Sequence, residues 1–92
     1  MVNYEDLINE LMRHLVNRYN DYSQLVAINY HKKHDERTLQ WNRGSKDVYK
    51  EEAEELAQKL GRKVEYALKT EKILADTPEE YEVEYLRMSI KY

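Results

Sequence analysis

A long apolar stripe with helical spacing begins near the start of the chain and most constrains its fold. From Tyr4 to Ile28, apolar side chains recur at intervals of three and four residues. That spacing places them on one face of an α-helix. We therefore predict a helix over residues 3–34. Asn20 and Asp21 are its weakest point, because both residue types favour turns and caps, and a break there is left open.

Capping residues predict where the helices begin. Asn3 can cap the first helix, since its side-chain oxygen can accept a hydrogen bond from the backbone of the first turn. Gly44 and Ser45 form the clearest boundary in the sequence, and Ser45 can cap a second helix. We predict a connection over residues 35–45 and a second long helix over residues 46–75.

The C-terminal segment has two interpretations. Thr77 followed three residues later by Glu80 is a capping box, which predicts a short helix over residues 78–91. Residues 81–92, however, alternate between apolar and polar side chains, which is typical of a strand. A strand here would need a partner, either residues 37–41 or a second copy of the chain. The pattern leaves helix and strand open and favours helix.

Scarcity of chain breakers decides the fold class. Two glycines and one proline in 92 residues are too few for the turns of a sandwich or barrel. The apolar fraction of 41% and the nine tyrosines argue against disorder, although 36% of the residues are charged. We predict a single all-α domain over residues 1–92: an elongated antiparallel hairpin of two long helices with a short C-terminal helix.

Two helices of that length carry more apolar surface than one short third helix can cover. A partner is therefore implied, and a second copy of the chain is the simplest candidate. We expect a homodimeric bundle that associates through one stripe of the first helix, made of Ile8, Leu11, Leu15, Tyr19, Tyr22 and Val26.

Several kinds of location and chemistry are not expected. Cysteine is absent, which excludes disulfides and thiolate chemistry. The longest apolar run is the four residues Leu25 to Ile28, far short of a membrane span. The N-terminal residues lack the pattern of a signal peptide. We expect a cytoplasmic protein without membrane contact.

The sequence contains little evidence for a catalytic site or a metal site. His31 and His34 share a helix face, but two lysines lie between them, so they are interpreted as a solvated helix end rather than metal ligands. Two glycines cannot build a phosphate-binding loop. Glu51, Glu52 and Glu55 form an E-E-x-x-E pattern that resembles the first half of the magnesium-binding motif of helical nucleotide pyrophosphohydrolases. That resemblance implies a metal-dependent hydrolase as an alternative. The primary expectation is a protein that is not an enzyme and has no cofactor.

Cationic and aromatic residues concentrate between residues 30 and 50. Six lysines and arginines face three acids there, a local charge of +3 in a chain of net charge −3. We expect this region to contact a protein partner, as in a small regulatory factor of bacterial or phage type. The alternative is contact with nucleic acid, which uses the same combination of cations and aromatic rings. The expected contact residues are Lys32, Lys33, Arg37, Trp41 and Arg43.

Overall fold

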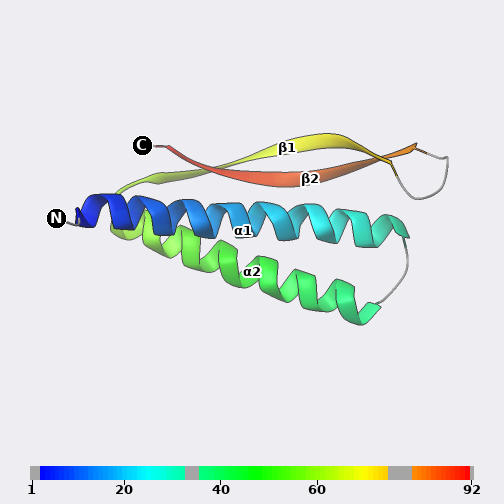
Figure 1. The fold of residues 1–92 in the computed structure, drawn as a ribbon, viewed down its shortest axis with the longest axis horizontal. Coiled ribbons are helices and arrows are strands. Elements are labelled where there is room, and N and C mark those ends of the chain that lie inside the picture. The colour runs from blue at the N-terminus through cyan, green and yellow to red at the C-terminus, as the bar shows by residue number, and fades with distance from the viewer. Residues whose placement is uncertain (1–2, 33–35, 75–79, 92) are drawn as a thin grey trace.

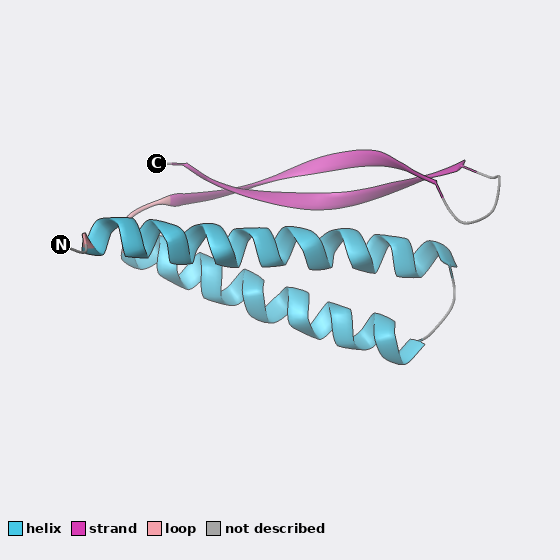
Figure 2. Ribbon diagram, viewed as in Figure 1, coloured by secondary structure: helices cyan, strands magenta, loops and turns pink. Residues whose placement is uncertain are grey.

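The chain folds as two helices and a β-hairpin in a computed structural model that describes residues 3–32, 36–74 and 80–91 (Figure 1). Helix α1 spans Tyr4–Lys32 and helix α2 spans Glu36–Lys59. Strands β1, Lys63–Leu74, and β2, Glu80–Lys91, form an antiparallel two-stranded sheet. Helix α1 lies between the hairpin and α2, and the molecule measures 51 × 25 × 24 Å (Figure 2).

The expectation of an all-α helical bundle is therefore wrong, and the fold is α+β. Residues 63–74, expected in the second helix, pair as β1 with β2 in a register from Lys63↔Lys91 to Leu74↔Glu80. Of the two interpretations of the C-terminal segment, the strand is the one the structure adopts. Its partner is neither residues 37–41 nor a second copy. Thr77 and Pro78 of the expected capping box lie outside the described residues.

Helix α1 begins as the sequence predicts and does not break. The backbone N–H of Glu5 donates to Asn3 Oδ1 at 3.0 Å, and the N–H of Leu7 donates to the Asn3 carbonyl at 3.2 Å. This confirms Asn3 as the cap. The helix continues through Asn20 and Asp21, because the Asn20 side chain bonds to β2 instead of competing for its own backbone.

Helix α2 spans the expected connection and ends earlier than expected. It begins at Glu36, so the predicted boundary at Gly44 and Ser45 lies inside the helix. It ends at a glycine motif: the Arg62 N–H donates to the Ala57 carbonyl at 2.8 Å, and the Gly61 N–H donates to the Gln58 carbonyl at 3.1 Å. Gly61 has a φ of 67°, the left-handed conformation that this motif requires. The turn redirects the chain into β1.

Replacing Gly61 tests this turn. We expect Gly61→Ala to lower the free energy of unfolding by about 1 kcal/mol, because a Cβ disfavours the left-handed conformation. No atom lies within 4 Å of a Cβ built there, so the loss comes from the backbone alone. The control is Gly44→Ala inside α2, where the same change removes a helix-interior glycine and is expected to gain up to about 1 kcal/mol. Urea denaturation followed by circular dichroism measures both, and equal effects would contradict the assignment.

The core lies where α1 meets both the hairpin and α2. Leu15 and Tyr19 of α1, Ala53 of α2 and Met88 of β2 are buried together. The sequence contains no phenylalanine, so tyrosine supplies the aromatic part of this core. Tyr19 meets Tyr66 of β1 edge to face, with ring centroids 5.9 Å apart. Because α1 contacts both layers, most of its apolar stripe is buried or partly buried within one chain.

Two polar side chains of α1 bind the outer edge of β2. Asn20 Oδ1 accepts the Met88 N–H at 2.7 Å, and Asn20 Nδ2 donates to the Met88 carbonyl at 3.1 Å. The Ser23 hydroxyl donates to the Leu86 carbonyl at 2.7 Å. Asn20 thus occupies the place that a peptide group of a third strand would take. This edge of the sheet is closed by a helix.

The hairpin twists so strongly that it buries different faces along its length. Val83 and Tyr85 are buried near the tip of the hairpin, whereas Met88 is buried and Ile90 partly buried near its base. The first two residues are odd-numbered and the last two are even-numbered, so the two pairs lie on opposite faces of β2. The register contains no bulge that could change this. Two-stranded ribbons twist more than larger sheets. At the middle of the hairpin, therefore, the edge of β2 faces α1, and β1 lies on the far side of β2 (Figure 1).

An isosteric change at Asn20 tests the closure of this edge. We expect Asn20→Asp to lower the free energy of unfolding by about 3 kcal/mol, because a buried carboxylate cannot donate to the Met88 carbonyl. Asn17→Asp introduces the same group at an exposed position of α1 and is expected to change stability by less than about 0.5 kcal/mol. Chemical denaturation near pH 7 compares them. Similar losses in both variants would show that the Asn20 hydrogen bonds do not hold the hairpin.

Candidate functional site

One face of α2 presents an apolar stripe to solvent beside α1. Trp41, Gly44, Ser45 and Val48 recur at i, i+3, i+4 and i+7, so they share a helix face. Trp41 is 63% exposed and Val48 is 52% exposed, although both side chains are large and apolar. Gly44 lies between them, and a Cβ built there meets no atom within 4 Å. The stripe therefore has a notch at its centre.

Aromatic rings from both helices form the wall of this notch. Tyr22 of α1 meets the Trp41 ring edge to face at 5.9 Å and stacks on Tyr49 at 5.7 Å. Both arrangements are among the preferred geometries of aromatic pairs, so the three rings support one another. We call this concave surface the aromatic groove; it is lined by Tyr22, Gln40, Trp41, Gly44, Ser45, Val48 and Tyr49.

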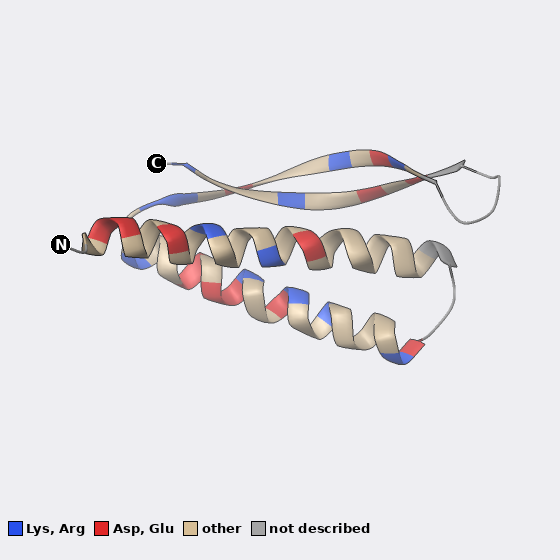
Figure 3. Cartoon of the chain, in the orientation of Figure 1, with Lys and Arg blue, Asp and Glu red and all other residues tan. Residues whose placement is uncertain are grey.

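Charge is distributed unevenly around the groove. The segment of α1 from Tyr22 to Tyr30 contains no charged residue, whereas acids and cations follow one another along α2 (Figure 3). Leu25, three positions after Tyr22, is 41% exposed on that neutral segment. The α1 side of the groove is thus apolar and neutral, and the charged side chains come from α2.

The structure separates the contact residues expected from the sequence. Trp41 belongs to the groove, but Arg43 lies over the Tyr30 ring at 4.8 Å. Asn42 between them is buried, so Trp41 and Arg43 diverge on either side of it. Arg37 is exposed near the start of α2. The side chain of Lys32 and all of Lys33 lie outside the described residues.

Most of the expected self-association stripe serves the chain's own core. Leu15, Tyr19 and Val26 are buried within the single chain, and Tyr22 and Ile8 are partly buried. Of the six residues, Leu11 alone is exposed. The argument for a dimer assumed that one short helix must cover these stripes. The β-hairpin covers α1 instead, so most of these six residues are not exposed on the single chain.

The acidic E-E-x-x-E residues form no metal centre in the described part of the chain. Glu51, Glu52 and Glu55 are exposed on α2, and Glu55 pairs with Lys59 at 3.2 Å as an i,i+4 pair. Among the residues the structure describes, no three histidine, aspartate or glutamate side chains are grouped as metal ligands. His34 and the side chain of His31 fall outside those residues.

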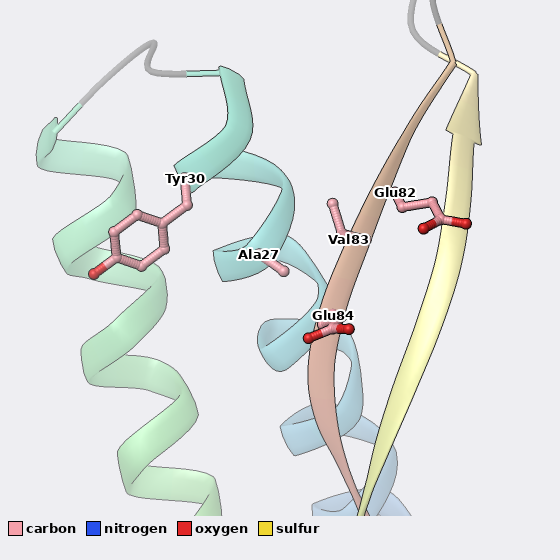
Figure 4. Close-up of a pocket in the computed structure, with 5 residues that line it drawn as sticks. All are labelled: Ala27, Tyr30, Glu82, Val83 and Glu84. Carbon is pink, nitrogen blue, oxygen red and sulfur yellow. The ribbon is translucent and has the colours of Figure 1, made fainter.

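A second depression lies between the end of α1 and the start of β2. It is lined by Ala27, Tyr30, Glu82, Val83 and Glu84 (Figure 4). Val83 lies beside Ala27, whereas the Glu82 carboxylate extends over β1 and away from Glu84 (Figure 4). The two carboxylates do not converge, so this depression offers neither paired acids nor a cation site.

A polar cluster joins β1, β2 and α1 near the tip of the hairpin. Glu71 Oε2 accepts hydrogen bonds from the Tyr85 hydroxyl at 2.7 Å and from Gln24 Nε2 at 2.8 Å. The Tyr85 hydrogen bond is the main reason that the pKa of Glu71 is lowered, and the charge of Lys69 acts in the same direction. Burial and the neighbouring carboxylate raise the pKa of Tyr85. These hydrogen bonds, which we call the Glu71 cluster, connect both strands to α1 through one titratable carboxylate.

The Glu71 cluster predicts a loss of stability in acid. Because the folded pKa of Glu71 lies below its unfolded value of 4.5, its contribution is present above that pH and is lost as the pH falls through the folded pKa. Glu71→Gln keeps an oxygen acceptor but does not titrate there. Carboxyl groups in proteins ordinarily have pKa values of about 3–5. We therefore expect the wild type to lose more unfolding free energy than this variant when the pH is lowered from about 6 to about 3. Parallel pH profiles would contradict the assignment.

Sequence reasoning missed Gly44, Ser45, Val48 and Tyr49 as parts of one surface. It treated Gly44 and Ser45 as a boundary between helices, which placed Trp41 in a connection. The signal that could have found the groove is the i, i+3, i+4, i+7 spacing, read through the glycine rather than stopped at it.

No described helix is both long and apolar enough to cross a membrane. Comparison of the chain with models of known protein families, with characterised proteins and with solved structures found no match.

Proposed function

We propose that this chain is a non-enzymatic, cytoplasmic binding protein that acts as an adaptor or regulator by holding an amphipathic helix of a partner protein. The observation that carries the proposal is the exposed pair Trp41 and Val48 on either side of the notch at Gly44. Large apolar side chains exposed together on one surface are typical of protein-binding sites.

A helix is the occupant that fits the shape. The groove runs along α2 beside Tyr22 of α1, and a helix laid against it would pack as a third helix on this pair. An apolar side chain of the partner can enter the notch at Gly44, where added atoms meet nothing. Trp41 then lies at the centre of the contact, and tryptophan is enriched among residues that dominate binding energy.

Nucleic acid fits less well because most aromatic faces nearby are occupied. Bases stack on open ring faces. One face of Tyr22 is covered by Tyr49, and Arg43 covers Tyr30. Farther along the molecule, Lys50 lies over the Tyr66 ring at 5.7 Å. The net charge of −3 also opposes phosphate binding.

Truncating Trp41 tests the proposal. We expect Trp41→Ala to weaken partner binding by roughly 30-fold or more, the loss typical of a central tryptophan. Tyr4→Ala is the matched control, since Tyr4 is an 81% exposed aromatic residue at the far end of α1. Tagged variants capture proteins from lysate treated with nuclease. The expected result is a protein retained by the wild type and Tyr4→Ala and lost by Trp41→Ala; retention by all three would contradict the proposal.

Filling the notch separates binding from folding. Gly44→Leu adds a good helix former inside α2, so we expect the fold to be retained while the side chain blocks the groove. Gln58→Leu adds the same group at an exposed α2 position outside the groove and is the matched control.

Trp41 is the single tryptophan, so its fluorescence also reports ligands directly. A fluorescence change on titration with single-stranded oligonucleotide, abolished by salt, would move the assignment to nucleic acid.

A further inference from the structure

The outer edge of β1 is an open strand edge. In an antiparallel pair, each residue turns its N–H and carbonyl either both toward the neighbouring strand or both away. Met88 turns both toward Asn20, and Leu86 turns its carbonyl toward Ser23. Their register partners Tyr66 and Leu68 therefore turn theirs away from β2 as well. Within the described residues, no hydrogen bond reaches this edge.

This edge is exposed along its middle. Residues 66–70 are all exposed, and β1 lies on the far side of β2 from α1 at the middle of the hairpin (Figure 1). Natural edge strands are usually shielded by charged side chains, lysine above all, by proline, by a bulge or by a covering element. Strand β1 does carry Lys63, Lys69 and Lys72. Strand β1 has no proline, and its regular register has no bulge. Such an edge is suited to pairing with another strand.

We propose that two copies of this chain pair through their β1 edges, antiparallel and centred on Ala67, to form a four-stranded sheet. In this register, Glu65 lies opposite Lys69 of the second copy. Lys63 lies opposite Glu71 of the second copy. The two-fold axis repeats each pair, so all four carboxylates of the two strands face lysines. Opposite charges directly across a sheet stabilise the pairing.

The charges also disfavour pairings of the two β1 strands that are centred one residue away from Ala67. Centring the pairing on Leu68 places Glu65 opposite Glu71 of the second copy. Centring it on Tyr66 places Lys63 opposite Lys69 of the second copy. Like charges directly opposite are destabilising. The outward N–H and carbonyl groups belong to even-numbered residues, which the Ala67 centre matches in pairs such as Tyr66 with Leu68 of the second copy.

Pairing also covers part of an exposed apolar pair. Leu68 and Leu86 are directly opposite in the hairpin register, and they are 63% and 47% exposed. In the proposed sheet, Leu68 lies beside Tyr66 of the second copy on the same face. The cross-strand contact removes apolar area from water in addition to the backbone hydrogen bonds. This surface is separate from the aromatic groove and does not depend on the proposed function.

Charge exchange at one pair tests both the edge and the register. The wild type is expected to sediment at tens of micromolar as twice the 11.2 kDa chain mass. Lys69→Glu replaces two attractive pairs in the dimer by two repulsive ones and is expected to weaken it roughly tenfold. Adding Glu65→Lys to that variant restores opposite charges and is expected to restore most of the affinity.

The matched control is Arg18→Glu on α1, which makes the same charge change at an exposed site away from the edge. Glu65 also pairs with Lys91 at 3.0 Å, so thermal unfolding of each variant checks that the fold persists. A monomeric wild type, equal dimerisation of Lys69→Glu and Arg18→Glu, or no recovery in the double variant would overturn the proposal.

Hydrogen exchange gives an independent measure of the edge itself. In a monomer, the outward N–H groups of Tyr66 and Leu68 exchange rapidly, whereas those of Ala67 and Lys69 point toward β2 and are protected. We expect the outward pair to become protected as the wild-type concentration rises and to stay unprotected in Lys69→Glu. Dimerisation that leaves Tyr66 and Leu68 unprotected would show that the copies associate elsewhere.

Discussion

The bidentate contact between Asn20 and the backbone of Met88 organises the sheet. It closes the outer edge of β2 with a helix side chain and leaves β2 resting on α1 by its edge. A two-stranded hairpin is marginal by itself in water. Here Asn20 and Ser23 anchor its middle, while its two ends bury opposite faces against the helices. The strong intrinsic twist of a two-stranded ribbon makes this arrangement possible, because it turns opposite faces of the hairpin toward the helices at its two ends.

The first helix could be predicted from the sequence because its signals are local. The three-and-four spacing and the Asn3 cap act within a few residues, and no distant contact opposes them. The second half misled the prediction for a physical reason. Glu65 and Lys69 have the spacing of a favourable helical pair, and the apolar residues Val64 and Leu68 fit both periods. Which period is used depends on β2, whose pairing is not encoded nearby.

Two glycines were assigned opposite roles from those they play. Gly44 was taken as a boundary, yet α2 continues through it, because buried Asn42, Ala53 and Ala57 hold that helix against its neighbours. The second helix was predicted to run through Gly61 to residue 75, yet Gly61 ends α2 with a positive φ. Local propensity ranks the two alike. Trp41 was predicted as a contact residue, whereas the groove beside it depends on Tyr22, which only the packing of α1 on α2 brings near.

The two proposed surfaces lie on opposite sides of α1, which sets what a pair of chains could do. The hairpin and α2 lie on opposite sides of α1 (Figure 1). The open edge belongs to β1, whereas the aromatic groove is lined by α2 and by Tyr22 of α1. Pairing through β1 therefore leaves both grooves accessible and related by the two-fold axis. A partner with two helices, or two linked partners, could engage both grooves at once, which raises affinity without any new contact. The single groove needs only modest affinity if the sheet edge supplies the second copy.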